Sequence, residues 1–220
     1  MGGRAGGGAS GGMGKGSRGG GNDFAREAMA KGHPLFERFR KEAYEKTMAS
    51  IDKNIKDPQL RAEMKAAVEK MHKEMGGLPE SGYEVKIVSS KEFVKLGGSG
   101  YEFGVHNGAG VFLNGRYYGR GYKSVEKLNK GQMEMGKMTT TNKPAMKSFV
   151  HEFGHGYYNG LSKEGKAQVA KVFSQFSSSK STKGWGSYAK KSATEFYADA
   201  VAKSVLGGSD KWTKALGKIK

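Results

Sequence analysis

The sequence predicts an α+β fold in which helices come first, a small and mostly antiparallel sheet follows, and further helices complete the chain. Three observations support this order. Apolar residues recur at helical spacing before residue 77, short apolar runs separated by Asn-Gly steps lie between residues 83 and 118, and helical spacing returns after residue 143. We therefore expect a single core with the sheet in the middle of the chain.

The first residues differ in composition from the rest of the chain. Residues 1–22 contain much of the glycine, three basic residues and no acidic ones, and they have nothing to bury. This composition predicts a disordered basic tail, followed by an N-terminal helical region (23–80) and a second domain (81–220). The tail lacks the apolar segment of a secretory signal, and no later stretch is apolar enough to span a membrane.

Two helices are expected in the N-terminal helical region. The first covers residues 23–56, with a break at Gly32-His33-Pro34, because proline suits a first helical turn. The second begins at Asp57-Pro58, where the aspartate can cap the helix, and ends at Gly76-Gly77. An apolar stripe at helical spacing predicts its buried face: Leu60, Met64, Ala67, Val68, Met71 and Met75.

The middle of the chain is typical of short strands. Residues 83–89 alternate between apolar and polar and predict a strand, and residues 90–96 predict a short helix. Two turn signals, Asn107-Gly108 and Asn114-Gly115, then separate short apolar runs. They predict a three-stranded meander with tight turns over residues 101–118.

The last part of the chain returns to helical patterns. Residues 120–140 are polar and predict a loop or a weak helix. A helix is expected from Pro144 to Tyr158, with Asn142 as its N-cap and Asn159-Gly160 as its end. Three further helices are predicted: one capped by Ser162, one over 193–206 and a short one from Ser209.

Charge and cysteine content limit the chemistry. The chain has no cysteine, so a zinc site must use histidine and carboxylate ligands. The formal net charge of +17 favours acidic partners such as nucleic acid or an acidic substrate. Because the basic residues are spread along the chain with no recognition helix, we expect at most weak, non-specific nucleic-acid binding through a diffuse basic surface.

One short motif in the helix predicted over 144–158 has metal-binding spacing. It reads His151-Glu152-Phe153-Gly154-His155, an H-E-x-x-H match. On a helix, His151 and His155 lie one turn apart on the same face, so both imidazoles can reach one Zn²⁺. Glu152 can then act as general base on a zinc-bound water. The alternative is two histidines and a glutamate on an ordinary helix.

A catalytic zinc usually has three protein ligands, so a further donor is needed. The longer pattern H-E-x-x-H-x-x-G-x-x-H fails, because its last two fixed positions hold Tyr158 and Leu161. No histidine follows His155. The third ligand is therefore an aspartate or glutamate, or it comes from upstream of the motif.

Two acidic residues downstream have suitable spacing. Glu195 and Asp199 lie four residues apart in the helix predicted over 193–206, and therefore on one face of it. Glu195 can bind the metal, while Asp199 can accept the spare N–H of a ligating histidine, most simply His151. The alternatives are a capping box formed by Ser192 and Glu195, and an exposed helix charge at Asp199.

Together these segments resemble a known family. The H-E-F-G-H motif, a later Ser187-Tyr188 and the run Glu195-Phe196-Tyr197-Ala198-Asp199-Ala200 are similar to the catalytic domain of anthrax lethal factor-like zinc metallopeptidases, over about residues 145–205. The resemblance implies a zincin-like domain of the gluzincin type. Asp199 stands where the family more often has glutamate.

The resemblance also implies roles for individual residues. It implies one Zn²⁺ per chain, Glu152 as general base and Tyr188 as a hydroxyl donor to the oxyanion of the tetrahedral intermediate, with three zinc ligands: His151, His155 and Glu195. The alternative for Tyr188 is an aromatic residue packed beside Trp185.

The expected function is that of a zinc metalloendopeptidase, toxin-like or phage-associated, acting on a polypeptide substrate. Such a substrate can pair with an exposed sheet edge, and we expect this edge at Val111, Phe112 and Leu113; the alternative is an ordinary hairpin packed on helices. The rival function is a basic module that binds nucleic acid or a virion component, with a structural or degenerate metal site. We expect a cytoplasmic or phage-associated location, or export by a route that needs no signal peptide.

Overall fold

A computed structural model describes residues 34–79 and 83–217, with side chains from residue 38 onward. The predicted tail (1–22) and the first residues of the predicted helical region lie outside the described residues. The chain divides into two compact units, residues 1–38 and residues 39–220. The described part of the first unit is the beginning of helix α2, and all contacts discussed below belong to the second unit.

Two helices precede the sheet, as the sequence predicts: α2 (Pro34–Asn54) and α3 (Pro58–Glu74). Asp57 caps α3 by accepting the N–H of Leu60 at 2.7 Å, and Pro58 is its first residue. The predicted stripe on α3 is buried from Leu60 to Met71. From Ala43 onward these helices share one hydrophobic core with the sheet and the later helices.

The sheet contains three described strands in the order β1-β3-β2: β1 (Glu84–Val88), β2 (Gly104–His106) and β3 (Gly110–Asn114). Asn107-Gly108 lies in the tight turn of the β2–β3 hairpin, where Asn107 and Gly110 exchange backbone hydrogen bonds. The prediction of a mostly antiparallel sheet is wrong, because β1 pairs with β3 in parallel. Helix α4 (Ser90–Lys95) and strand β2 form the crossover that brings the chain back beside β1.

The prediction of a third meander strand after Asn114 is also wrong. Residues after Asn114 form the short helix α5 (Gly115–Tyr118), because the Asn114 side chain accepts the N–H of Arg116 at 3.1 Å and so caps a helix where a hairpin turn was expected. The place of that strand is taken by β1.

The prediction that Val111, Phe112 and Leu113 form an exposed edge is wrong as well. These residues belong to β3, which hydrogen-bonds to β1 on one side and to β2 on the other. All five residues of β3 are buried. A strand that is paired on both sides has no free backbone groups with which to bind a peptide.

Helices make up most of the chain after the sheet. They are α6 (Tyr122–Glu134), the 3₁₀ turn η1 (Pro144–Met146), α7 (Lys147–Gly160), α8 (Lys163–Ser177), the 3₁₀ turn η2 (Ser187–Lys190), α9 (Ala193–Val205) and α10 (Lys211–Leu216). Ser162 caps α8 as predicted. Asn142 does not cap α7: η1 leads directly into it, and Met146 occupies the cap position without a side-chain bond.

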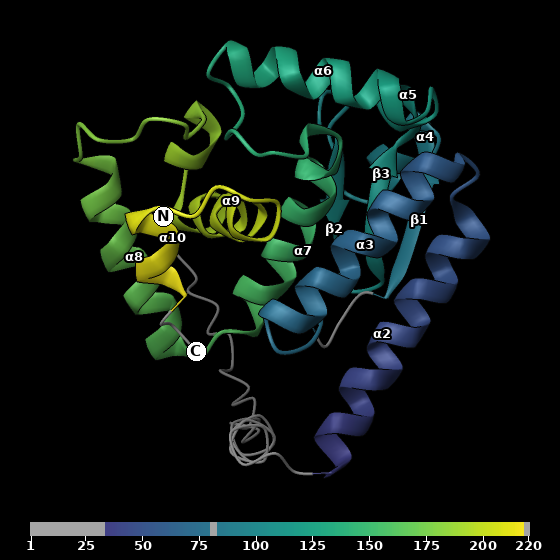
Figure 1. The fold of residues 1–220 in the computed structure, drawn as a ribbon, viewed down its shortest axis with the longest axis horizontal. Helices are drawn as coiled ribbons and strands as arrows, with labels where there is room; N and C mark the ends of the chain where they lie inside the picture. The colour runs from purple at the N-terminus through teal and green to yellow at the C-terminus, as the bar shows by residue number, and fades with distance from the viewer. Residues whose placement is uncertain (1–33, 80–82, 218–220) are drawn as a thin grey trace, which may run out of the picture. The chain divides into compact units, whose positions relative to one another are not determined.

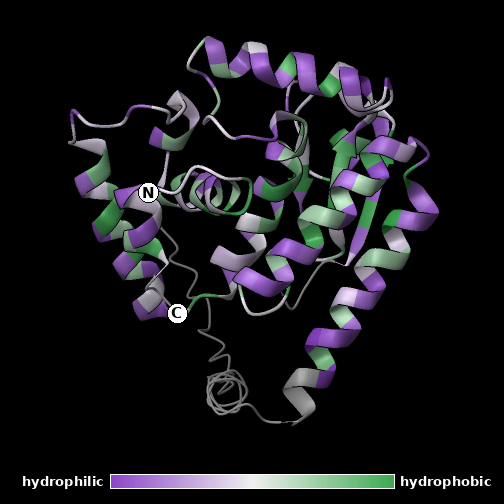
Figure 2. Cartoon of the chain, viewed as in Figure 1, coloured by the Kyte–Doolittle hydropathy of each residue, from purple (hydrophilic) through white to green (hydrophobic). Residues whose placement is uncertain are grey.

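Helix α7 is central to the second unit. It packs against β2 and β3 and makes its most extensive contact with α9, so that it lies between the sheet and α9 (Figure 1). The sheet is rich in hydrophobic residues, whereas α6 is mostly hydrophilic (Figure 2). None of the helices in the described ranges is long and apolar enough to cross a membrane.

Candidate metal centre

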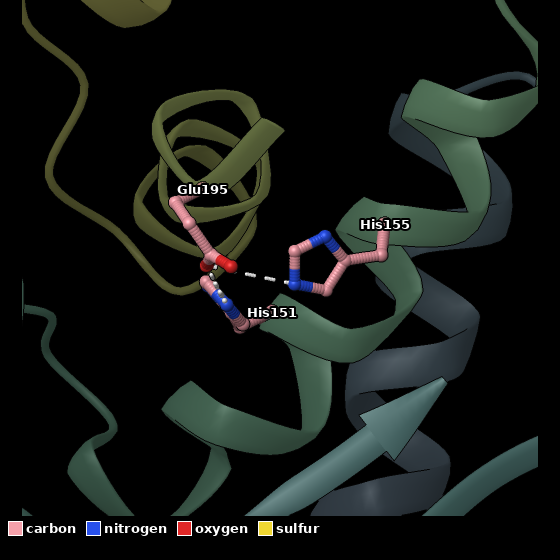
Figure 3. A group of neighbouring side chains, drawn as sticks. All are labelled: His151, His155 and Glu195. Atoms are coloured by element: carbon pink, nitrogen blue, oxygen red, sulfur yellow. Dashed lines mark hydrogen bonds and ion pairs between the residues drawn. The ribbon is translucent and has the colours of Figure 1, made fainter. Parts of the chain in front are cut away.

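Three side chains from two helices converge at the contact between α7 and α9. His151 and His155 come from α7, Glu195 comes from the first turn of α9, and their side chains point toward one another (Figure 3). The Glu195 Oε2 atom lies 3.0 Å from Nε2 of His151 and 3.6 Å from Nε2 of His155. One ligand atom from each of the three lies within 4.8 Å of the other two.

This group can hold a metal ion. Donor atoms about 2.0–2.1 Å from one tetrahedral zinc lie roughly 3.3 Å apart, and the two measured separations, 3.0 and 3.6 Å, fall on either side of that value. Two imidazoles and one carboxylate also leave a fourth position for water, as catalytic zinc sites do. The residues present therefore fit zinc.

The convergence depends on a glycine within the motif. Helical spacing alone places His151 and His155 on one face of α7, but Glu195 must approach from α9. At Gly154, a Cβ atom would lie 2.6 Å from the Cα of Ala198 on α9. The absence of a side chain at Gly154 therefore allows the two helices to come close enough to form the group.

The ionisation of the ligands reflects burial and their mutual charges. Burial, and then the nearby charge of His151, lower the pKa of His155 to about 4, so its imidazole is neutral near pH 7. Burial raises the pKa of Glu195, but the hydrogen bond and charge of His151 outweigh it and lower that pKa overall. Burial lowers the pKa of His151, yet its carboxylate partners outweigh burial and raise it.

The other ring nitrogen of His151 faces a fully buried carboxylate. The Nδ1 atom lies 2.7 Å from Oδ1 of Asp199, so we assign the proton to Nδ1, which leaves the Nε2 lone pair toward the metal position. The predicted contact between Asp199 and His151 is thus present. The alternative of an exposed charge at Asp199 is wrong, because the residue has no exposed surface.

Two further groups bind the same carboxylate. The ammonium of Lys147 donates to Oδ1 of Asp199, and the hydroxyl of Thr139 donates to Oδ2. Burial raises the pKa of Asp199, but the charges of Lys147 and His151 outweigh it and hold that pKa well below its usual range. Asp199 is therefore ionised and fully paired in the interior.

Glu152 lies between the helix and the sheet. It is buried, and burial is the main cause that raises its pKa to about 7. Strand β2 passes close by: a Cβ atom at Gly104 would lie 2.7 Å from Cγ of Glu152 and 3.2 Å from its Oε1 atom. A carboxylate with a pKa near neutrality can both accept and return a proton.

Tyr188 lies in η2, which packs against α9. Its ring centroid is 6.1 Å from that of His151, and the Lys191 ammonium is 3.8 Å from its ring centroid. Burial, and then the nearby carboxylates, raise the pKa of Tyr188 to about 12, so its hydroxyl keeps its proton near pH 7. The hydroxyl is thus available as a donor.

The structure also qualifies the capping alternative for Glu195. Ser192 does cap α9, because its hydroxyl accepts the N–H of Glu195 at 3.2 Å. The carboxylate of Glu195, however, points to His151. The backbone of Glu195 therefore takes part in the cap, while its side chain belongs to the metal group.

Sequence reasoning missed two residues of this site. Lys147 stands four residues before His151, on the same face of α7, so helical spacing carried a signal for it. Thr139 reaches Asp199 from a loop 60 residues away, and no local pattern indicates that contact.

Comparisons with protein-family models, with curated proteins and with solved structures found no match for this chain. The resemblance to lethal factor-like peptidases therefore rests on the motif residues alone.

Proposed function

We propose that this chain is a zinc-dependent endopeptidase. The observation that carries the proposal is the meeting of His151 and His155 with Glu195, with a buried glutamate of near-neutral pKa directly after the first histidine. A site that only stabilised the fold would not need Glu152 in this position. When bound, zinc would supply Lewis-acid chemistry to a water molecule and a peptide carbonyl.

The protein groups then have separate tasks. Glu152 accepts a proton from the attacking water and returns it to the leaving amine, for which its pKa of about 7 is suited. Tyr188 donates its hydroxyl proton in a hydrogen bond to the carbonyl oxygen as negative charge develops there. Asp199 holds His151 in the tautomer and orientation that binding requires.

The strand that we propose for peptide binding is β2. Among the described strands, β2 lies at an edge of the sheet, and it packs against α7 beside Glu152. An extended polypeptide that adds to this edge would bring a backbone carbonyl near the general base. This assignment replaces the expected role of Val111, Phe112 and Leu113.

The test uses Glu152→Gln, which keeps the shape of the side chain and removes its basicity. We expect about one equivalent of bound zinc in both wild type and variant, measured by elemental analysis. Cleavage of a proteome-derived peptide mixture should fall by roughly 10²–10⁴-fold in the variant. The matched control is Glu164→Gln, an exposed glutamate on α8, which should cleave as wild type does.

Wild-type cleavage rates in Glu152→Gln would exclude the proposed mechanism. The net charge of +17 favours one other function, a basic module that binds nucleic acid or a virion component. Tight DNA binding with a steep salt dependence, in a protein without peptidase activity, would support that function in place of the peptidase.

A further inference from the structure

Thr139 connects two parts of the site that lie apart along the chain: Asp199 on α9 and Gly186 just before η2. Its side chain is fully buried, and its hydroxyl donates to Oδ2 of Asp199. The Thr139 hydroxyl oxygen in turn accepts the backbone N–H of Gly186 at 3.0 Å. One hydroxyl therefore connects the carboxylate behind His151 to the residue that immediately precedes η2.

The segment around Thr139 also holds the Tyr188 loop through its backbone. The N–H of Ser187 donates to the carbonyl of Gly136 at 2.9 Å, and the N–H of Tyr188 donates to that of Lys137 at 3.4 Å. In the other direction, the N–H of Thr140 donates to the carbonyl of Gly184 at 3.0 Å. Residues 136–140 thus form a support for residues 184–188.

Contact between these two segments is too close for a side chain at Gly186. A Cβ atom there would lie 2.5 Å from the carbonyl carbon of Met138 and 2.6 Å from the backbone nitrogen of Thr139. Both are backbone atoms, which cannot rotate away. The position of Tyr188 is therefore set by residues 136–140, and Thr139 fixes those residues to Asp199.

We propose that Thr139 is a positioning residue, which holds the Tyr188 hydroxyl at a fixed place relative to the metal ligands. This inference rests on the proposed function, because Tyr188 matters to catalysis only if the chain cleaves peptides. The physical reason is that a donor to a developing oxyanion must be held in place before the reaction, and small displacements cost much of its effect.

The first test is a double-mutant cycle of Thr139→Val and Tyr188→Phe. Valine keeps the shape of threonine and removes its hydroxyl. We expect Thr139→Val to lower kcat by roughly tenfold or more, with little change in KM, because the Tyr188 contact forms only in the transition state. In the Tyr188→Phe background, Thr139→Val should lower kcat by a clearly smaller factor than in wild type, because the donor it positions is gone and only its hydrogen bond to Asp199 is lost.

Two variants separate positioning from a general loss of structure. Thr139→Ser keeps the hydroxyl and should retain wild-type kcat. Gly186→Ala introduces a Cβ against residues 138–139 without touching Asp199, and it should reproduce the loss of kcat seen in Thr139→Val. The inference is overturned if Thr139→Val lowers kcat equally in both backgrounds, or if it has no effect in the wild-type background.

A second measurement does not depend on activity. Hydrogen exchange of the backbone amides in residues 184–190 should become faster in Thr139→Val than in wild type or Thr139→Ser. Unchanged exchange there would overturn the inference whether or not the protein cleaves peptides. Faster exchange in a protein that cleaves no peptide would support the link through Thr139 and reject the proposed function.

Discussion

The two ring nitrogens of His151 face environments of opposite character. Nε2 faces Glu195 and His155, whose side chains are only partly buried and crowd three donor groups into one place. Nδ1 faces Asp199, where Lys147 and Thr139 complete a buried and fully paired group. The first side could hold a cation supplied from outside, whereas the second already contains the Lys147 ammonium. The group that could bind a metal and the buried ion pair therefore lie on opposite sides of a single imidazole.

The largest expected effect on stability comes from breaking the buried side. Lys147→Met leaves the charge of Asp199 without its ammonium partner, and the free energy of unfolding should fall by about 3–5 kcal/mol. Urea unfolding of the metal-free protein measures this. The control is Lys143→Met, which removes a partly exposed ion pair with Glu63 of 2.6 Å and should cost no more than about 1 kcal/mol. Equal losses of unfolding free energy in Lys147→Met and Lys143→Met would show that the buried ion pair contributes no more to stability than the exposed one.

We expect zinc to bind on the Nε2 side of His151, between Glu195 and His155, and thereby to stabilise the folded protein. At a free zinc concentration 100 times the dissociation constant, the free energy of unfolding should rise by about 2.7 kcal/mol over the protein in chelator. His155→Ala should abolish that rise, because it removes one of three ligands. His72→Ala, on α3, should retain it. A rise that survives in His155→Ala would place the ion elsewhere.

A smaller effect should follow from separating the two helices that meet at the site. In Gly154→Ala, the new methyl group would meet the backbone of Ala198, at a cost of about 1–3 kcal/mol in the free energy of unfolding. Zinc affinity should fall with it, because Glu195 moves away with α9. Chelator competition measures the affinity, and unchanged affinity would show that α9 adjusts without moving Glu195.

The smallest expected effect is a gain in stability, opposite in sign to the losses expected for Lys147→Met and Gly154→Ala. Gly131 lies within α6, and a Cβ atom there would have no neighbour within 4 Å. Gly131→Ala should therefore raise the free energy of unfolding by about 0.5–1 kcal/mol, since alanine favours helix more than glycine does. Thermal unfolding of Gly131→Ala and Gly154→Ala under the same conditions measures this difference. It tests whether the space around each added methyl group decides if the substitution stabilises or destabilises the protein.

The sequence predicts those features that depend on local spacing. The histidine pair follows from the helical repeat, and α3 and α8 follow from their caps and stripes. Exclusion of histidine as the third donor leaves several candidates, and spacing along one predicted helix favours Glu195 with Asp199. In the structure Glu195 lies beside both histidines and Asp199 lies beside His151.

Features that depend on long-range pairing were not predictable in this way. Nothing local in Glu84–Val88 indicates that it pairs in parallel with β3, and this pairing is what removes the edge expected at Val111 to Leu113. Asn114-Gly115 is equally suited to a hairpin turn and to a helix cap, and only the surrounding structure decides between them. The role of Thr139 depends on a contact that exists only after folding.

The distance along the chain between the donors has a consequence for biosynthesis. Glu195 follows His151 by 44 residues, and it reaches the imidazole only when α9 has docked beside Gly154. A ribosome that has released no more than α7 and α8 holds a nascent chain with two of the three donors. The complete group of three donors therefore forms only after α9 has been synthesised and has docked on α7.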